Sequence, residues 1–579
     1  MNHFLKVIDR KPRKIVGFFV KSLTLFTIAV TFFTLQSGAQ VTLTASSGVP
    51  AAGYATLKQA FDAINAGIHH GDIIISINAS TNEGTTPAIL NSNDADPSSY
   101  LSVLIQPTDD NIVITGNPAS GFGVIQLNGA DNVTINGDNP NSGGTNRNLT
   151  ISNTTTATFT GTSCIRVATS SAVKSADNIS IMNCIISGNV TAGNSNAITA
   201  TSSSSNISFG IYAGGNAGAT ATGAPTAITS ETANSAPVGT TMYSFTVTNN
   251  AISNCGRAIV YNNASSTGSN IVSVSQNEIG TSASLGAYPY TSPSGTVYVS
   301  GIWLSGANNV TVNGNIINNL MSFVQTARTG IDLFSNISGT MSVTGNTITG
   351  VVSNSAGAYP ALGISVSSAG GVYTVRDNNI SKIENSSSAI GAPASGIRIN
   401  TASGPGTISV NRITEVMNRN AGPSPAQGIY LATASNGTII RNNFITNIMN
   451  VGNGSFNFTG NANGILISSG NSHKVYNNSI NQYGTSLAIG TNSINCLSIS
   501  SNILQGIDIR NNIFSNTVTG GAANNVHACL FFPFGISASM GLTLNNNAYY
   551  TGNTAGLSGI AFAGSVFYAA ASLYSVGNF

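Results

Sequence analysis

The chain has 579 residues, of which 7% are charged, 41% are hydrophobic and 63 are glycine. Regular alternation of so many apolar residues excludes a disordered chain, and the low charge is not typical of ordinary mixed α/β domains. The formal charge is +2, but past residue 40 there remain 14 basic and 17 acidic side chains, so that part carries 14 − 17 = −3. A faintly acidic chain that has no basic stripe of the sort that a nucleic-acid surface needs is not expected to bind nucleic acid.

Residues 1–39 have the order of a secretory signal peptide. A basic start is followed by the apolar run SLTLFTIAVTFFTL at 22–35 and then by small residues that end at Ala39. This order predicts cleavage near Ala39 and a secreted or cell-surface location. The alternative is a membrane anchor, for which the apolar run after Lys21 is short. We expect no membrane span after cleavage, because no later segment is apolar enough.

Residues 40–78 predict an N-terminal cap helix and a first strand. Within ATLKQAFDAINAGIHHGDIIISI at 55–77, apolar residues recur with a helical period before the strand begins. Thr56 with Gln59 can form a capping box, and Gly67 can end the helix. Such a helix would close one end of a β-structure and protect its strand edges.

Residues 79–550 repeat one unit. The pattern apolar-x-x-Asn-x-apolar occurs ten times at intervals of 27 to 38 residues. Its asparagines are Asn250, Asn277, Asn315, Asn346, Asn378, Asn411, Asn443, Asn478, Asn512 and Asn547. A short strand of the form GIxL precedes most of them, as in GIWL at 301 and GIDL at 330. Each unit therefore predicts at least two strands, and so short a unit must stack on its neighbours to bury its apolar side chains.

Stacked units place identical side chains above one another, about 4.8 Å apart. Asparagine suits such a position because it tolerates left-handed turns, and its amide can both donate to and accept from its neighbours. The repeated asparagine is therefore predicted to form a turn ladder of a parallel β-solenoid with about a dozen coils. Residues 551–579 are expected to be either a C-terminal cap or a truncated end.

The repeated strand-plus-Asn units and the segment 55–77 resemble the right-handed parallel β-helix repeat proteins of the pectin-lyase-like superfamily, of the secreted bacterial type. The resemblance covers roughly residues 41–550 and implies an all-β right-handed parallel β-helix (solenoid) with a short N-terminal capping α-helix. Enzymes of this superfamily place Asp with Arg or Lys on neighbouring coils of one face, to hold Ca²⁺ or to act as acid and base. We expect no such cluster in this chain.

The third residue of the GIxL strands is expected to point outward. Down the stack this position reads Trp303, Asp332, Ser365, Arg398, Tyr430, Leu466, Ser498 and Phe531. Trp303 and Tyr430 are candidate ligand-binding residues, because flat rings stack on sugar faces. Asp332 and Arg398 are weak catalytic candidates, two coils or about 10 Å apart. The alternative is an ordinary sheet face enriched in aromatic and β-branched residues.

A second outward stripe contains cationic residues. It holds Arg376, Arg441, Tyr476 and Arg510, with Lys474 and Asp508 close by. Arg376 and Arg441 are candidate ligands for an anionic glycan. The alternative is charge that blunts the edges of the sheet against pairing with other chains.

Histidine and cysteine predict no metal site. His473 takes a position that is apolar in other coils, and His69 with His70 lacks further ligands nearby. The five cysteines occupy the positions of small packing residues. Cys496 and Cys529 would stack in consecutive coils, so a disulfide between them is left as an alternative. We expect no metal and no cofactor.

The sequence thus predicts an exported cell-surface or extracellular module with a structural, adhesive or glycan-binding role and without catalysis. Its expected partner is a polysaccharide or surface glycan. The alternative is a polysaccharide lyase or hydrolase acting on acidic glycans, with Ca²⁺ only in that case.

Overall fold

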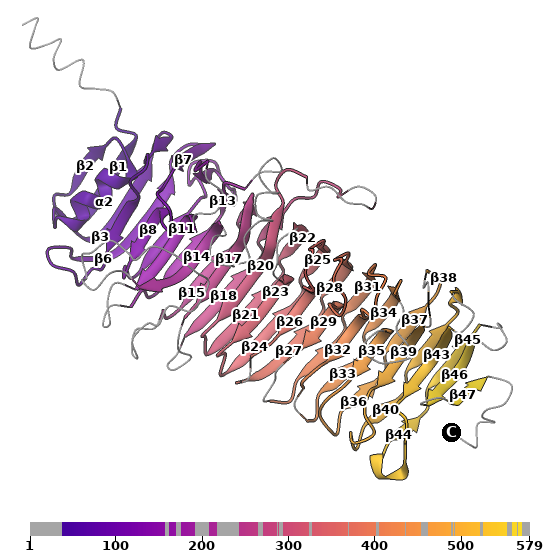
Figure 1. Cartoon of the computed structure of the whole chain (residues 1–579). Helices are drawn as coiled ribbons and strands as arrows, with labels where there is room; N and C mark the ends of the chain where they lie inside the picture. Colours follow the sequence, from indigo (N-terminus) through magenta and orange to yellow (C-terminus); the bar gives the residue numbers. More distant parts are fainter. Residues whose placement is uncertain are drawn as a thin grey trace, which may run out of the picture.

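The computed structural model describes residues 38–569 except for a set of internal gaps. The gaps are 157–160, 170–174, 191–207, 217–241, 264–269, 286–287, 289–292, 323–326, 369, 401–403, 435, 453–460, 488–489, 491, 522–524, 553–557 and 564–565. The predicted signal-peptide run and the last ten residues lie outside the described residues. The chain is elongated and advances from α2 and β1 at one end to β44 and β46 at the other (Figure 1).

Three stacks of parallel strands make up the molecule, and each coil contributes one strand to each stack. Sheet A contains β3 (His69–Ile77), β6 (Tyr100–Pro107), β9 (Val133–Asn136), β12 (Ile179–Met182), β15 (Phe245–Thr248), β18 (Ile271–Ser275), β21 (Asn309–Asn313), β24 (Thr340–Thr344), β27 (Val372–Arg376), β30 (Thr407–Ser409), β33 (Ile439–Arg441), β36 (Lys474–Tyr476), β40 (Asp508–Arg510) and β44 (Thr543–Asn545).

Sheet B follows sheet A in each coil after a tight turn. It contains β4 (Thr81–Asn82), β7 (Ile112–Gly116), β10 (Leu149–Asn153), β13 (Cys184–Ser187), β16 (Ala251–Ser253), β19 (Glu278–Gly280), β22 (Ile316–Ser322), β25 (Thr347–Ser353), β28 (Asn379–Asn385), β31 (Arg412–Asn418), β34 (Phe444–Asn450), β37 (Ser479–Gln482), β41 (Ile513–Asn516) and β45 (Ala548–Thr551). A small side pair, β38 (Thr485–Ser486) and β42 (Thr519–Gly520), lies in the loops that follow β37 and β41.

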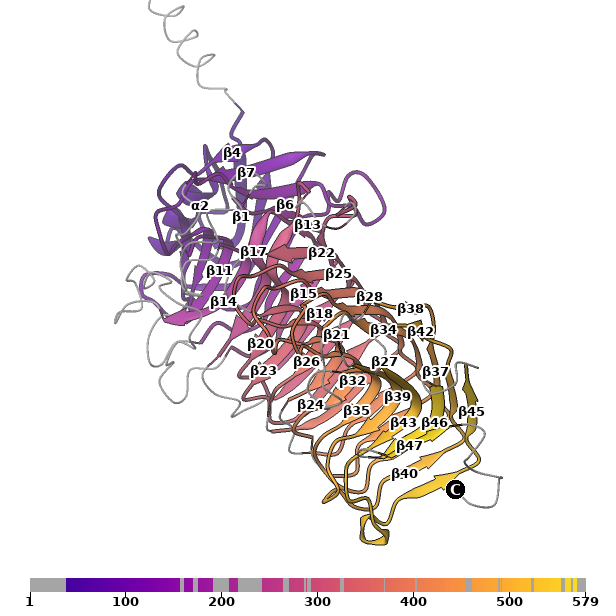
Figure 2. The ribbon, with the colours of Figure 1, turned by 45° about the vertical axis from the view of Figure 1, so that its right-hand side comes forward.

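Sheet C completes each coil. It contains β5 (Ala88–Asn91), β8 (Gly123–Asn128), β11 (Ser163–Thr169), β14 (Phe209–Asn216), β17 (Cys255–Asn262), β20 (Val297–Ser305), β23 (Arg328–Ser335), β26 (Ala361–Val366), β29 (Ala394–Ile399), β32 (Ala426–Leu431), β35 (Ala462–Ile467), β39 (Ser493–Ile499), β43 (Val526–Phe532) and β46 (Ser558–Ala563). The antiparallel strand β47 (Val566–Ala569) pairs with β46. The turned view in Figure 2 shows the coils as stacked loops around a common interior.

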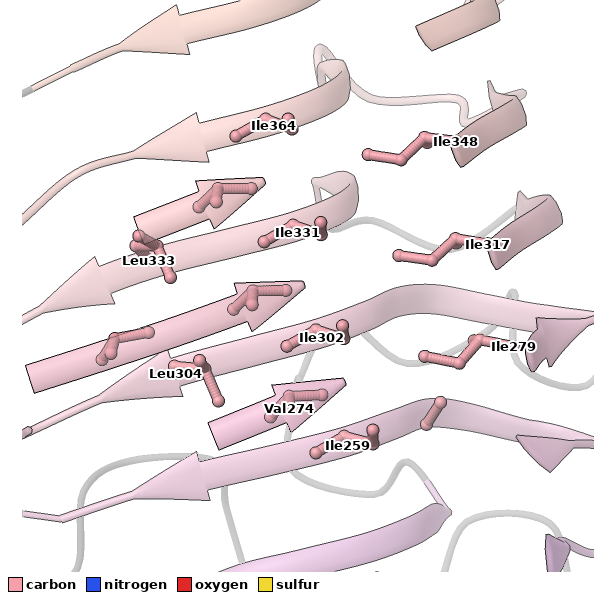
Figure 3. Close-up of a cluster of buried hydrophobic side chains, with 14 of the residues drawn as sticks. Ile259, Val274, Ile279, Ile302, Leu304, Ile317, Ile331, Leu333, Ile348 and Ile364 are labelled. Atoms are coloured by element: carbon pink, nitrogen blue, oxygen red, sulfur yellow. The ribbon is translucent and has the colours of Figure 1, made fainter. Parts of the chain in front are cut away.

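These sheets confirm the expected all-β right-handed parallel β-helix. The A and C strands are the two predicted from the repeat, and the residues after the repeated asparagine add the B strand as a third. The inward side chains form columns, such as Ile302, Ile331 and Ile364 in sheet C (Figure 3). All three are fully buried, and each fully buried isoleucine contributes about 1.5–3 kcal/mol of hydrophobic stabilisation.

The predicted asparagine ladder lies in the turn between sheets A and B. Asn378 illustrates one rung: its Nδ2 donates to Asn411 Oδ1 at 2.9 Å and to Val343 O at 3.0 Å. Its Oδ1 accepts from both the backbone N–H and the Nδ2 of Asn346, each at 3.0 Å. Because the same bonds recur from Asn250 to Asn547, every amide of the ladder satisfies buried backbone groups as well as its neighbour.

The left-handed conformation was expected at the ladder asparagine, but it belongs to the residue before it. That residue is Asn249, Gln276, Gly314, Gly345, Asp377, Val410, Asn442, Asn477, Asn511 or Asn546, with φ between 52° and 65°. The ladder asparagine therefore contributes the hydrogen bonds of its amide, and the residue before it makes the turn. Val410, with φ of 58°, is a β-branched residue in a region that such residues rarely adopt.

The helix α2 (Leu57–Asn65) closes the N-terminal end, as expected. Thr56 Oγ1 accepts from Gln59 N at 3.2 Å, and Gly67 follows the helix with φ of 68°. The carboxylate of Glu83 adds a cap that sequence reasoning missed, because it accepts from Leu57 N at 3.2 Å and Lys58 N at 2.8 Å. The antiparallel strands β1 (Val41–Gly48) and β2 (Ala51–Tyr54) extend sheet A beside the helix.

Cysteine and histidine behave as packing residues. All five cysteines are buried and free, including Cys496 and Cys529. His473 is fully buried, its Nε2 lies 2.9 Å from Ser469 O, and burial lowers its pKa. Within the described ranges, no three His, Cys, Asp or Glu side chains gather as a metal site would require. No helix in the same ranges is long and apolar enough to cross a membrane.

Candidate functional site

The predicted column of sheet C is in register but largely closed. Trp303 pairs with Asp332, Asp332 with Ser365, Ser365 with Arg398, and Arg398 with Tyr430. Trp303 is only 7% exposed, and the column ends in buried Leu466, Ser498 and Phe531. The sequence therefore predicted which residues share this face, but the expectation of an open face is wrong for most of them.

The rings of Trp303 and Tyr430 pack against neighbouring side chains. The Trp303 ring lies 5.0 Å from the ring of Phe334, and the Arg257 guanidinium lies 5.7 Å from its centroid. The Arg398 guanidinium covers the Tyr430 ring at 5.4 Å. Asp332, Arg398 and Tyr430, in the first half and middle of the column, remain partly exposed.

Asp332 and Arg398, the two catalytic candidates, are separated in the column. Ser365 lies between them in the column, which keeps them two coils apart as expected. Burial raises the pKa of Asp332 to about 6, while the Ser365 hydroxyl and the Arg257 cation lower it. Burial also lowers the pKa of Arg398. The carboxyl group of Asp332 can hold a proton near neutral pH.

The second predicted stripe lies on sheet A and is open to solvent. Arg376 pairs with Ser409, Ser409 with Arg441, Arg441 with Tyr476, and Tyr476 with Arg510. The side chains of Arg376 and Arg510 are 57% and 46% exposed. The structure thus brings Arg376 and Arg441 into one column.

A groove that the sequence analysis did not predict lies on the outer face of sheet B. It has a volume of about 490 Å³ and is lined by the five consecutive strands from β22 to β34 and by the loop Ser282–Leu285 after β19. A hollow of about 190 Å³ shares Met417 and Asn447 with it and continues to the loop at Tyr483. Six coils from β22 to β37 span roughly 24 Å. The two hollows together follow the long axis of the molecule.

A left-handed residue interrupts the regular pairing in each of the five lining strands of sheet B, without a change of register, at the floor of this groove. The bulged residues are Asn319, Gly350, Lys382, Glu415 and Asn447, with φ between 54° and 78°. We call this stack the bulge ladder. The flanking residues pair regularly on both sides while the bulged residue has no partner across the ladder, as between Asn318–Leu320 and Thr349–Val351. Gly and Asn suit left-handed backbone, whereas Lys382 and Glu415 adopt it at a cost.

Four charged side chains line the middle of the groove. Lys382 and Glu415 occupy adjacent positions of the bulge ladder, and Glu384 and Arg419 line the groove beside them. Arg419 Nε lies 2.6 Å from Glu384 Oε1, and Ser386 Oγ donates to the same oxygen at 2.8 Å. The Glu384 side chain is 7% exposed and that of Arg419 is 26% exposed. This buried, doubly bonded carboxylate fixes the orientation of the arginine.

The loop after β19 forms one wall of the groove. Asn319 Nδ2 donates to Thr281 O at 2.8 Å and to Ala283 O at 2.6 Å, which ties the start of this loop to the bulge ladder. Further along the loop, the Tyr288 ring lies 4.7 Å from the Arg419 guanidinium, although Arg419 follows β31, four coils away. Tyr288 is 53% exposed. An exposed aromatic ring therefore lies against a cation that lines the groove.

The expectation that acids and bases do not cluster on one face is wrong for sheet B. Sequence reasoning missed the cluster because Lys382 and Glu415 were not recognised as bulge residues, whose side chains line the groove. A signal was present in the charge distribution. Residues 376–419 carry eight of the 31 charged side chains found past residue 40 (14 + 17 = 31), although they are 44 residues long.

No protein-family model matches this chain, and no curated protein matches it. Among solved structures, the A-module of mannuronan C-5 epimerase AlgE6 from Azotobacter vinelandii aligns with 88% of this chain and 95% of its own length. The identity is 9% and the TM-score is 0.33. A likeness of this degree assigns neither a family nor an activity, so the function has to follow from the residues of the groove.

Proposed function

We propose that this chain is an exported β-helix protein of the pectin-lyase-like type, which binds a linear polysaccharide along the groove of sheet B. The observation that carries the proposal is the groove itself, which extends over several coils and holds Lys382, Glu415 and the Glu384–Arg419 ion pair. Export is proposed from the signal-peptide pattern of residues 1–39.

The lining of the groove fits a sugar chain in both polarity and shape. Amide side chains such as Asn318 and Asn447 can donate to and accept from hydroxyl groups, and Met417 and Leu285 offer apolar surface to sugar faces. Tyr288, stacked on Arg419, supplies an exposed ring at the wall. A long open groove with mixed polarity suits an extended chain better than a compact small molecule, whose sites are enclosed and mostly apolar.

A second candidate function is cleavage of an acidic polysaccharide. One observation favours it: a lysine, an arginine and two carboxylates line one groove on neighbouring coils. A Ca²⁺ ion needs several oxygen ligands, and Glu384 Oε1 already accepts from Arg419 and Ser386. These residues do not form a Ca²⁺ site by themselves, so this chemistry would rest on Lys382 and Arg419.

The test is retention of the mature chain on a panel of neutral and acidic polysaccharides, followed by calorimetric titration of the best ligand. Tyr288→Ala and Lys382→Gln should each weaken binding about ten-fold, because each removes a ring contact or a charged hydrogen bond. Lys58→Gln, on the cap helix at the far end, is the matched control and should bind as the parent does.

Three outcomes separate the two candidate functions. Binding without new chain ends supports the binding role, whereas new unsaturated or reducing ends that disappear in Lys382→Gln establish cleavage. Full affinity in both groove variants, or no retention on any polysaccharide, contradicts the proposal.

A further inference from the structure

The cationic column on sheet A is separate from the groove and has a regular spacing. Arg376, Arg441 and Arg510 lie in one column, with Ser409 and Tyr476 in the coils between them. An arginine therefore recurs every second coil, at about 10 Å along the axis of the molecule. The same column carries uncharged Asn313 and Thr344 before Arg376 and Asn545 after Arg510. The charge is a local departure from the repeat.

Acidic neighbours pair with two of these arginines. Arg376 Nε lies 3.1 Å from Asp377, and Arg510 Nε lies 2.5 Å from Asp508 Oδ1. Tyr476 Oη donates to Asp508 Oδ2 at 2.6 Å, so ring and guanidinium share one carboxylate. Lys474 pairs in register with Asp508. We call these residues the strip: the cations are Arg376, Arg441, Lys474 and Arg510, and the acids are Asp377 and Asp508. The strip has an excess of positive charge, although the chain past residue 40 is faintly acidic.

Apolar side chains accompany the arginines along the corner between sheets A and B. Val410, Phe444 and Ile513 are 42%, 43% and 54% exposed. Phe444 follows Arg441 after the tight turn, and the Arg412 guanidinium lies 5.9 Å from its ring. A ligand on this strip would meet cations at regular intervals and apolar surface between them.

We infer that this strip is a second binding surface, which takes an extended anionic polysaccharide whose acidic and neutral sugars alternate. Such a chain presents its anionic groups at every second sugar, and so matches a cation at every second coil. Charge complementarity favours a polyanion. A single column of exposed cations suits a linear chain, whereas a membrane surface would require a broad apolar and basic patch. The proposal does not depend on the groove of sheet B.

The experiment measures binding of size-defined hyaluronan, an alternating polyanion, with neutral dextran, a DNA duplex and phosphatidylglycerol vesicles as further probes. The parent should bind hyaluronan, and its affinity should fall as salt rises, because exposed charges are screened. Replacing Arg376, Arg441 and Arg510 together by Gln should weaken binding about ten-fold or more. The corresponding triple Lys variant keeps the charge and should retain most of the affinity.

A spacing variant tests the register without changing the net charge. Thr344→Arg combined with Arg441→Thr leaves three arginines in the column but destroys the two-coil interval, and it should bind hyaluronan more weakly than the parent. Lys58→Gln, on the cap helix, should bind hyaluronan as the parent does. Loss of hyaluronan binding in Lys382→Gln but not in the triple Gln variant would place hyaluronan in the groove and overturn this inference without overturning the proposed function. Equal binding by parent and triple Gln variant, by parent and spacing variant, or by hyaluronan and DNA or vesicles, overturns the inference.

Discussion

Two stacks of left-handed residues run along this molecule, and they serve different purposes. The first precedes the asparagine ladder in the turn between sheets A and B, and the second is the bulge ladder of sheet B. In the first, the left-handed residue precedes a ladder amide, and that of Asn378 is buried and bonded on both sides, to Asn346 and to Asn411. In the second, Lys382 and Glu415 replace the favoured Asn or Gly and line an open groove. The first stack, beside the buried asparagine ladder, stabilises the fold. The second, the bulge ladder, accepts backbone strain at Lys382 and Glu415 and thereby places charged side chains in the groove.

The largest effect should come from breaking the asparagine ladder beside the first stack. Asn378→Ala removes the acceptor of two Asn346 donors and the donor to Val343 O, all of them buried. We expect the free energy of unfolding to fall by about 3 kcal/mol, measured by urea denaturation. Asn379→Ala, one residue further and exposed, is the matched control and should change little. A similar loss in both variants would show that the ladder has no special role.

The buried face of sheet C should respond to pH. Because the folded-state pKa of Asp332 is raised to about 6, above the value of an unfolded aspartate, the folded chain binds the proton more tightly. Stability from this group is present at low pH and is lost as pH rises from about 4 through about 6. Asp332→Asn should therefore be more stable than the parent by about 2 kcal/mol at pH 8, and less so at pH 4. Parallel pH profiles of the two proteins would contradict this.

A smaller effect is expected in the turn stack at Val410. A β-branched residue at φ of 58° is strained, and asparagine tolerates this region. Val410→Asn should raise the free energy of unfolding by about 1 kcal/mol. Val372→Asn, at an exposed position of the extended strand β27, serves as the control and should not stabilise the chain. Destabilisation by Val410→Asn would mean that the exposed valine contributes more by packing than it costs by backbone strain.

The smallest change in stability is expected in the bulge ladder, and it tests whether its charged residues support the fold. Lys382→Asn and Glu415→Asn place the favoured residue in the bulge ladder, so each should raise stability by about 0.5 kcal/mol, seen as a slightly higher midpoint in thermal unfolding. A loss of stability on either substitution would show that these side chains support the fold rather than the groove.

The fold could be predicted from the sequence because its evidence recurs. Asn250 to Asn547 repeat at one position of each coil, and the GIxL strands fixed the register that places Trp303, Asp332 and Arg398 in one column. Whether that column was open could not be predicted, since exposure depends on what packs over the sheet. The groove depends on a backbone bulge at Lys382 and Glu415 and on a loop that brings Tyr288 to Arg419 across four coils. Neither feature has a residue pattern of its own.

The double variant Lys382→Asn with Glu415→Asn tests the central claim most directly, by its affinity for the polysaccharide that the parent binds, measured beside its thermal stability. We predict that the double variant is at least as stable as the parent, because the bulge ladder is kept. We also predict that it binds this polysaccharide about ten-fold or more weakly, because the charges are lost. Unchanged affinity in a stable double variant would contradict the assignment of the groove as the binding site.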